Sequence, residues 1–313
     1  MELRIVFMGT PDFAVPSLRV LVENGYTVAG VVTATDKWGG RGKKQLLQSP
    51  VKKYALIHDI PVLQPKNLKD PDFIERLRSL RANLQVVVAF RMLPEIVWTM
   101  PTFGTFNLHG SLLPKYRGAA PINWAIINGE SETGVTSFFL QHEIDTGDMI
   151  FQEKMPIHED DTAGDVHDRM MLLGAQTVLK TVQAIEQGQV PTRKQDDARA
   201  TKAPKIFRET CEINFNQPAQ EVHNFIRGLS PYPAAWSTLD GKQFKILRST
   251  LTGEETHLPP GTLRSDDKTY LRVACQDQLL ALHVVQLQGR KRMEITDFLN
   301  GFQLAQTSGR LGQ

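Results

Sequence analysis

Leu3-Arg4-Ile5-Val6-Phe7-Met8, followed by Gly9-Thr10-Pro11-Asp12, is the stretch that indicates the fold. The first six residues are almost continuously apolar, which is typical of a strand buried on both faces of a parallel sheet. The next four predict a turn, because glycine and proline favour tight backbone bends. A helix is expected to follow over roughly residues 13–24, so the chain opens with a strand, a turn and a helix.

The same alternation of strand and helix continues over nearly 190 residues. Ser49-Pro50 and Asp70-Pro71 each place a capping side chain before a proline, which is a helix start signal. Thr162 is expected to cap a long helix that ends near residue 187. The remaining apolar runs predict strands at 27–33, 85–90, 102–109, 136–140 and 149–156. This alternation predicts an α/β fold with a Rossmann-like, mainly parallel sheet covered on both faces.

The last third of the chain has a different pattern. Residues 188–208 are polar, contain prolines and basic residues, and show no regular period, so we interpret them as an interdomain linker. Beyond them, strands are predicted at 211–215, 236–239, 244–249, 270–274 and 279–288, and a helix at 218–227. Short strands separated by glycine and proline turns predict a small β-barrel. The expected domains are therefore residues 1–187 and 209–313.

Bulk composition excludes several classes of protein. The 313 residues, 41% hydrophobic and 22% charged, are typical of a globular protein of about two domains. The two cysteines, Cys211 and Cys275, form no C-x-x-C pair, which argues against a disulfide framework and fits a reducing cytosol. The apolar start is too short for a signal peptide, and no stretch is long enough to span a membrane, so we expect a cytoplasmic protein. The net charge of +2 neither requires nor excludes a nucleic-acid partner.

The motifs of several common cofactor enzymes are missing from the sequence. The first strand is followed by Gly-Thr-Pro-Asp-Phe-Ala and not by G-x-G-x-x-G, so the backbone cannot approach a pyrophosphate in the usual way. No P-loop, H-E-x-x-H or G-x-S-x-G motif occurs either. A NAD-dependent oxidoreductase is therefore disfavoured, and no metal site is expected.

Three polar residues are candidates for a reaction centre. Asn107 and His109 stand two apart at the predicted end of a strand, so both side chains point to one face. Ligands bind beyond the carboxyl ends of strands in open α/β sheets. Downstream, the polar loop at residues 142–148 follows another predicted strand and can bring Asp145 beside His109.

An amide, an imidazole and a carboxylate together suit acyl transfer. The amide and imidazole can stabilise an oxyanion, and the carboxylate can fix the imidazole tautomer and favour its protonated form. An acceptor amine can attack directly, so no serine or cysteine nucleophile is required. Spacing alone also allows a structural histidine at a strand end and a turn-forming aspartate.

Two motifs resemble the signature of the folate-dependent formyltransferases. They are Asn-Leu-His-Gly-Ser-Leu-Leu-Pro with Tyr-Arg-Gly at residues 107–118, and Ile-Asp-Thr-Gly-Asp at residues 144–148. The resemblance implies three catalytic residues, Asn107, His109 and Asp145. It also implies a tetrahydrofolate site lined by Ser111, Leu112, Leu113 and Pro114. The cosubstrate would be 10-formyltetrahydrofolate, with no metal.

Further features resemble the members of that superfamily that act on methionyl initiator tRNA. They are the opening residues, the basic loop at 40–44, and the C-terminal segments at 288–293 and 297–301. The resemblance implies an OB-like C-terminal domain and tRNA contacts from Arg41, Lys43, Lys44, Arg290, Lys291 and Arg292. The implied activity is transfer of the formyl group to the α-amine of methionyl initiator tRNA, for translation initiation, by a monomer. In it, Asn107 and His109 would stabilise the oxyanion, and Asp145 would orient His109.

Other interpretations stay open on the residues alone. A relative that formylates an amino sugar or a nucleotide would share the centre without requiring the basic loop or the second domain. A hydrolase would release free formate, and a non-catalytic RNA-binding protein would not require the three intact residues. Both basic clusters can equally be ordinary solvated turns. Residues 35–39 and 90–94 depart from the family pattern, and the second places Arg91 near the expected pterin pocket.

Overall fold

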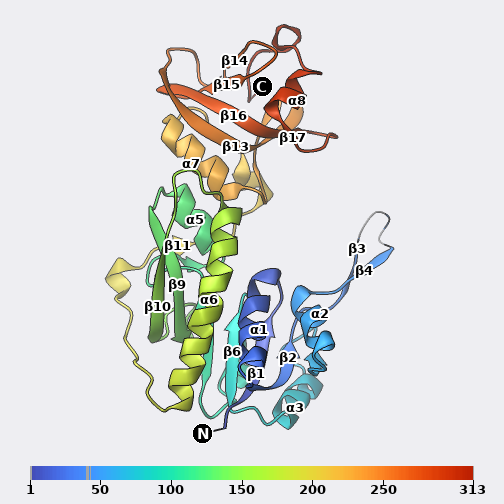
Figure 1. The fold of residues 1–313 in the computed structure, drawn as a ribbon, viewed down its shortest axis with the longest axis vertical. Coiled ribbons are helices and arrows are strands. Elements are labelled where there is room, and N and C mark those ends of the chain that lie inside the picture. Colours follow the sequence, from blue (N-terminus) through green and yellow to red (C-terminus); the bar gives the residue numbers. More distant parts are fainter. Residues whose placement is uncertain (1, 40–41, 43, 313) are drawn as a thin grey trace. The chain divides into compact units, whose positions relative to one another are not determined.

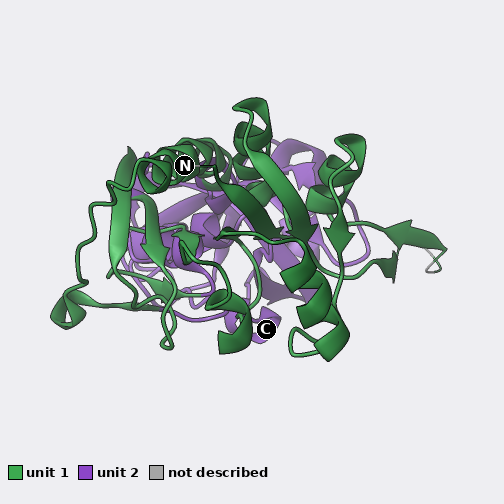
Figure 2. Ribbon diagram, turned by 90° about the horizontal axis from the view of Figure 1, so that it is seen from below, with its two compact units in different colours: residues 1–118, 134–155, 167–202 green, residues 119–133, 156–166, 203–313 purple. Residues whose placement is uncertain are grey.

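The computed structural model describes residues 2–39, 42 and 44–312, and the chain forms two compact units, coloured separately in Figure 2. Unit 1 comprises Met1–Gly118, Gly134–Met155 and His167–Lys202, and unit 2 comprises Ala119–Thr133, Pro156–Val166 and Ala203–Gln313. Neither unit is one continuous segment, because the chain passes between them repeatedly. The expected domains, residues 1–187 and 209–313, are each one continuous segment, whereas each unit combines several segments that contact one another. The division into domains stays a prediction.

Unit 1 is built on a seven-stranded sheet in the order β10-β9-β7-β6-β1-β2-β5 (Figure 1). Its strands are β1 (Arg4–Gly9), β2 (Thr27–Val32), β5 (Val62–Leu63), β6 (Leu84–Val88), β7 (Thr105–His109), β9 (Glu132–Phe139) and β10 (Met149–Pro156). The run from β5 to β7 is parallel throughout, whereas β9 pairs antiparallel with β7. The predicted α/β class with a mainly parallel sheet is confirmed.

The helices among and after these strands are α1 (Val15–Glu23), α2 (Pro50–Ile57), α3 (Pro71–Ser79), α4 (Glu95–Trp98) and α6 (Ala163–Glu186). Of these, α2, α3 and α6 begin at the caps that the sequence predicts. Ser49 Oγ and Asp70 Oδ1 each accept a backbone N–H of the first helical turn at 3.0 Å. Thr162 and Asp165 exchange two hydrogen bonds, of 2.9 and 3.2 Å, in a reciprocal capping box. These local contacts set the starts of α2, α3 and α6.

The sheet is covered on both faces, and this decides where side chains of β7 point. On one face, buried side chains of β1, β2, β5 and β6 pack with those of α3 and α4. On the other face, α6 approaches so closely that a Cβ at Gly174 would lie 2.7 Å from Leu108 Cδ2. Leu108 therefore points toward α6, and its neighbours Asn107 and His109 point to the opposite face.

The basic segment near residue 40, which the sequence predicts as a loop, is framed by two paired strands. Strands β3 (Lys37–Gly39) and β4 (Gln45–Leu47) pair antiparallel, and the hairpin projects from the sheet of unit 1 (Figure 1). Trp38 lies opposite Leu46 in this pairing and is 65% exposed. The tryptophan therefore does not serve to pack the hairpin into the core.

Unit 2 is dominated by an antiparallel sheet. Its strands are β12 (Ala235–Leu239), β13 (Lys242–Glu255), β14 (Leu263–Ser265), β15 (Leu271–Ala274), β16 (Gln278–Leu287) and β17 (Met293–Glu294). Helices α5 (Pro121–Ile127) and α7 (Ala219–Leu229) cross so closely that a Cβ at Gly228 would lie 2.6 Å from Ile127 Cγ1. A second domain of antiparallel strands, as expected from the sequence, is confirmed.

One predicted strand of the C-terminal region, at residues 211–215, is wrong. The chain instead forms a 3-10 helix, η4 (Arg208–Cys211), and Glu212 makes only an isolated bridge to Trp236. Cys211, Ile213 and Phe215 are all buried in the core of unit 2, which explains the alternating pattern. Alternate burial without a paired neighbouring strand does not make a β-strand. The short helix α8 (Ile295–Leu299) was not predicted, because a single turn carries little periodicity.

Candidate active site

Asn107 and His109 lie at the carboxyl end of β7. Asn107 is opposite Val87 of β6 and Phe138 of β9, and His109 is opposite Thr136 of β9. The parallel strands β1, β2, β5 and β6 end at the same edge. This edge is where ligands bind in open α/β sheets.

The imidazole of His109 is enclosed, with 6% of the residue exposed, and oxygen atoms face both of its nitrogens. Nε2 donates a hydrogen bond to the carbonyl oxygen of Tyr116 at 2.8 Å. Nδ1 is 3.7 Å from Oδ2 of Asp145. A carbonyl only accepts, so Tyr116 selects the tautomer with hydrogen on Nε2. An ion pair with Asp145 forms when Nδ1 also carries a proton.

Asp145 lies in the loop between β9 and β10, and its side chain is 12% exposed. Its Oδ2 accepts a hydrogen bond from the backbone N–H of Gly118 at 2.9 Å. Its backbone is in the left-handed region, with φ 57°, which residues other than glycine rarely adopt. At Gly147 a Cβ would lie 1.7 Å from the Phe139 carbonyl oxygen, so only glycine fits there. The loop therefore has a closely defined path, which carries the carboxylate to His109.

The segment expected to line a folate site is fixed against β9. Ser111 and Leu113 are buried, whereas Leu112 and Pro114 are partly exposed. Thr136 Oγ1 donates to the Ser111 carbonyl at 2.7 Å and accepts from the Leu113 backbone N–H at 3.1 Å. The side chains of this segment that remain accessible to a ligand are thus those of Leu112 and Pro114.

Gln195 and Thr201, in the segment interpreted as a linker, contact the loops that carry Asp145 and Tyr116. Gln195 Nε2 donates to the carbonyl oxygens of Asp145 and Gly147, at 2.8 and 2.9 Å. Thr201 Oγ1 accepts a hydrogen bond from the backbone N–H of Tyr116 at 2.8 Å. Neither residue can be found from the sequence, because no local period or motif marks them and only the tertiary contact does.

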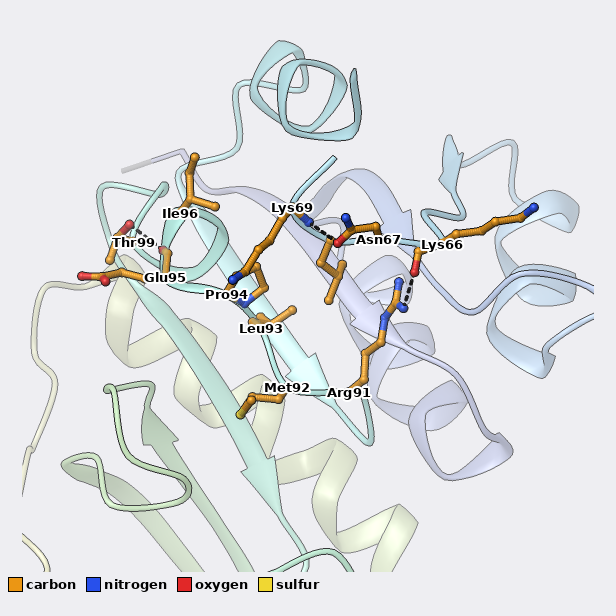
Figure 3. Close-up of a pocket in the computed structure, with 11 residues that line it drawn as sticks. Lys66, Asn67, Lys69, Arg91, Met92, Leu93, Pro94, Glu95, Ile96 and Thr99 are labelled. Atoms are coloured by element: carbon orange, nitrogen blue, oxygen red, sulfur yellow. Dashed lines mark hydrogen bonds between the residues drawn. The ribbon is translucent and has the colours of Figure 1, made fainter. Parts of the chain in front are cut away.

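An open cavity of about 840 Å³ lies at the same edge of the sheet, between the loop after β5 and α4 (Figure 3). Its lining combines cationic and apolar side chains, including Lys66, Lys69, Arg91, Met92, Leu93, Pro94 and Ile96. Figure 3 shows the Arg91 guanidinium turned toward the Lys66 backbone, where it donates to the carbonyls of Pro65 and Lys66. The lining does not include Asn107, His109 or Asp145.

The basic residues expected to contact tRNA fall into two groups. Of the first, Arg41 and Lys43 lie outside the described residues, and Lys44 is exposed directly before β4. The second group, Arg290, Lys291 and Arg292, is exposed in the turn between β16 and β17. The two groups belong to different units of the chain.

A polar network fixes the base of the β3–β4 hairpin. Lys52 Nζ donates to Asp36 Oδ2 at 2.5 Å and to Gln64 Oε1 at 2.8 Å. Gln64 Nε2 in turn donates to Asp36 Oδ1 at 2.8 Å. The hydrogen bond from Lys52, and then that from Gln64, lowers the pKa of the Asp36 carboxyl group. Asp36 directly precedes β3, so the network joins the hairpin to α2 and to the segment after β5.

Two general properties of the described residues bear on the kind of site. Among them, no group of three or more His, Cys, Asp or Glu side chains is arranged to hold a metal ion. In the same part of the chain, no helix combines the length and the apolar character that a membrane crossing needs.

Known family patterns match both parts of the chain. Residues 3–182 match the family described as formyl transferase, and residues 205–303 match the formyl transferase C-terminal domain. The first match covers more than half of the chain and includes Asn107, His109 and Asp145. The chain belongs to the formyl transferase family. It is therefore an enzyme that transfers formyl groups.

Relatives resemble this formyl transferase along almost its entire length. The methionyl-tRNA formyltransferase of Parabacteroides distasonis is 55% identical over 311 residues, which is 96% of each chain. That of Azobacteroides pseudotrichonymphae is 56% identical over 309 residues, or 95% of each chain. That of Bacteroides fragilis is 53% identical over 314 residues, or 97% of each chain.

Solved structures share the fold of this formyl transferase at low sequence identity. The sugar 3N-formyltransferase WlaRD matches with a TM-score of 0.67 and 23% identity, over 93% of this chain and all of that chain. An N-formyltransferase from Helicobacter canadensis, solved with folinic acid and dTDP-3-aminofucose, has the same TM-score and identity, over 90% of this chain and 98% of its own. At this identity the likeness concerns the fold alone.

Proposed function

We propose that this formyl transferase moves the formyl group of 10-formyltetrahydrofolate to the α-amine of methionyl initiator tRNA. The observation that carries the proposal is the identity of 53 to 56% with relatives named methionyl-tRNA formyltransferase. The match extends over at least 95% of both chains, so it is not confined to either part of the chain.

The proposed reaction moves an acyl group between two nitrogen atoms. The neutral amine attacks the formyl carbon, and a tetrahedral intermediate with a negatively charged oxygen forms. The bond from that carbon to N10 of the folate then breaks, N10 takes up a proton, and the new amide nitrogen loses one. The main demands on the protein are to position two substrates and to stabilise the oxyanion.

We assign stabilisation of the oxyanion to Asn107 and His109, which share one face at the end of β7. Both nitrogens of the His109 ring already face oxygen atoms, so we expect His109 to act through the charge of its protonated ring. Asn107 would supply the direct hydrogen bond from its side-chain amide. Asp145 orients the ring and balances its charge.

We place the cosubstrate against the segment Ser111, Leu112, Leu113 and Pro114. Because the side chains of Ser111 and Leu113 are buried, the contacts would come from Leu112, Pro114 and the backbone. For the tRNA we propose contacts with Arg41, Lys43 and Lys44 in unit 1 and with Arg290, Lys291 and Arg292 in unit 2. Arginine and lysine neutralise phosphates and release counterions, which supplies much of nucleic-acid affinity.

An enzyme that formylates an amino sugar is the nearest rival. The fold does not distinguish it, because WlaRD matches over 93% of this chain and therefore has a comparable second domain. The acceptor is decided by an assay with 10-formyltetrahydrofolate and charged initiator tRNA, charged elongator methionyl-tRNA, a nucleotide-linked amino sugar, or no acceptor.

Formyl-methionine on initiator tRNA, with much less on elongator tRNA, is the expected result. Formate released without an acceptor would indicate a hydrolase, and transfer to the amino sugar alone would indicate the rival. Absence of formyl-methionine on both tRNAs would contradict the proposed acceptor.

A further inference from the structure

We propose that residues 193–201 form a strap that positions the reaction centre, with Gln195 and Thr201 as its positioning residues. The proposal rests on the proposed roles of His109 and Asp145. Gln195 lies 50 positions after Asp145 in the chain, in a segment whose sequence shows no catalytic motif. The strap positions two oxygen atoms that face the His109 ring, the carbonyl oxygen of Tyr116 and Oδ2 of Asp145.

Gln195 holds the loop that carries Asp145. Both hydrogens of its side-chain amide are used, on the carbonyl oxygens of Asp145 at 2.8 Å and of Gly147 at 2.9 Å. Its Oε1 accepts two hydrogen bonds from the Arg117 guanidinium, at 3.1 Å from Nε and 2.8 Å from Nη2. The amide is thus fully bonded, and no other side chain of similar length offers two donors and one acceptor in this arrangement.

The same contact region also holds the carboxylate of Asp145. Arg117 Nη2 donates further to Asp197 Oδ1 at 2.6 Å, so the strap fixes the guanidinium from two sides. The next residue, Gly118, donates its backbone N–H to Asp145 Oδ2 at 2.9 Å. The backbone of Asp145 is therefore held directly by Gln195, and its carboxylate is linked to the strap through Gly118 and Arg117.

Thr201 holds the other oxygen atom that faces His109. Its Oγ1 accepts the backbone N–H of Tyr116 at 2.8 Å, and its carbonyl accepts that of Arg117 at 2.9 Å. Its own N–H donates to the Pro114 carbonyl at 3.3 Å. The Tyr116 carbonyl is the acceptor for His109 Nε2. Thr201 therefore positions the Tyr116 carbonyl, which faces Nε2 of His109. In the same way, Gln195 positions the loop that carries the Asp145 carboxylate, which faces Nδ1.

Both held residues need support from their surroundings. Tyr116 and Asp145 have φ of 61° and 57°, a region that persists at a non-glycine residue only where contacts maintain it. The strap is itself anchored at its start, because Arg193 and Met149 of β10 exchange two backbone hydrogen bonds of 2.9 Å. It therefore has a fixed end from which to hold the two loops.

The test compares Gln195→Ala and Thr201→Val with Thr201→Ser and with Gln189→Ala, an exposed glutamine of the same region. Valine removes the Thr201 hydroxyl at nearly constant shape, and serine keeps it. We expect Gln195→Ala and Thr201→Val to lower kcat per folded enzyme by about 10- to 100-fold, because small misplacements of reacting groups are costly. KM for both substrates should stay within about twofold, and Thr201→Ser and Gln189→Ala should keep the parental kcat.

A purely structural role would lower the thermal midpoint without this separation of kcat from KM. Parental kcat in both Gln195→Ala and Thr201→Val, or an equal loss in Thr201→Ser and Thr201→Val, would overturn the strap. Hydrogen exchange gives a readout that does not depend on turnover. The Gly118 amide should exchange faster in Gln195→Ala, and unchanged protection would reject the strap even if the parent protein formylates no tRNA.

Discussion

At the scale of single residues, the proposed chemistry depends on the two oxygen atoms around one buried ring. The Tyr116 carbonyl at 2.8 Å holds Nε2 of His109, so the ring cannot turn without losing that hydrogen bond. The Asp145 carboxylate lies 3.7 Å from Nδ1 and forms an ion pair with the ring when Nδ1 carries a proton. The ring is thus fixed between two oxygen atoms, with the side chain of Asn107 on the same face of β7.

We predict that Asn107→Ala and His109→Ala each lower the rate of formyl transfer by about 100- to 1,000-fold, the usual cost of losing an oxyanion donor. Folate affinity, measured by fluorescence titration without tRNA, should stay near the parental value, because neither change alters Leu112 or Pro114. The control is His257→Ala, at an exposed histidine of unit 2, which should retain parental turnover. Near-parental single-turnover rates in both site variants would remove these residues from the mechanism.

At the scale of elements, the β3–β4 hairpin carries the proposed tRNA contacts of unit 1, and the Asp36–Lys52–Gln64 network fixes its base. An anchored base limits the directions in which the hairpin can point. The hairpin does not belong to the seven-stranded sheet, so its sequence can change with little effect on the fold.

We predict that Arg41→Ala, and the double variant Lys43→Ala/Lys44→Ala, raise KM for methionyl-tRNA and leave folate binding unchanged. In the double variant the rate of transfer should also decline less steeply as salt rises. The reason is that each lost phosphate contact reduces the number of counterions that tRNA binding releases. The matched control is Arg76→Ala/Arg78→Ala, which removes two exposed cations from α3. If both double variants show the parental salt dependence, the hairpin does not contact tRNA.

Elements with local signals were the ones that could be predicted from the sequence. Ser49 and Thr162 set helix starts through hydrogen bonds within one turn, and the Asn107–His109 pair follows from strand alternation. The strap at 193–201 could not be predicted, because its order comes from contacts with residues about 50 to 85 positions earlier in the chain. The false strand at 211–215 shows the converse case, in which burial alternates but no neighbouring strand completes the pairing.

At the scale of the whole molecule, stability should depend on pH through a histidine buried in unit 2. His223 of α7 is 2% exposed, with Nδ1 3.0 Å from Ser249 Oγ and Nε2 3.7 Å from Asp160 Oδ1. Burial, and then the charge of Arg227, lowers the pKa of His223, against the opposing effects of Glu159 and Asp160. The unfolded chain therefore binds a proton more readily than the folded chain does.

We predict that the free energy of unfolding falls as pH drops below about 6.5, the ordinary pKa of histidine, and that His223→Gln makes this decline less steep. Above that pH both states leave the ring neutral, so the contribution is constant there. Urea unfolding at pH 7.5, 6.5 and 5.5 measures the slope, with His257→Gln as the exposed control. An unchanged slope in His223→Gln would show that another group accounts for the acid sensitivity.

The interleaving of the two units has a consequence for biosynthesis. Residues 119–133 and 156–166 leave the ribosome well before 203–313, with which they form unit 2. Until then the apolar side of α5 lacks α7, against which Ile127 packs. Unit 1, by contrast, has all its segments once Lys202 has emerged. A nascent chain halted near residue 208 would therefore carry all segments of unit 1 and two segments of unit 2 whose partners are still missing. Apolar surface exposed in this way favours aggregation and chaperone binding.

The same interleaving predicts how the chain tolerates being split. A fragment of residues 209–313 produced alone should fail to give a dispersed NMR spectrum, because α7 would lack its α5 partner. Co-expression with residues 1–208 should restore a folded, copurifying pair. If the smaller fragment folds unaided, α5 is dispensable to the core that it covers. The chain would then consist of two successive modules, and a gene encoding either could have been duplicated or exchanged on its own.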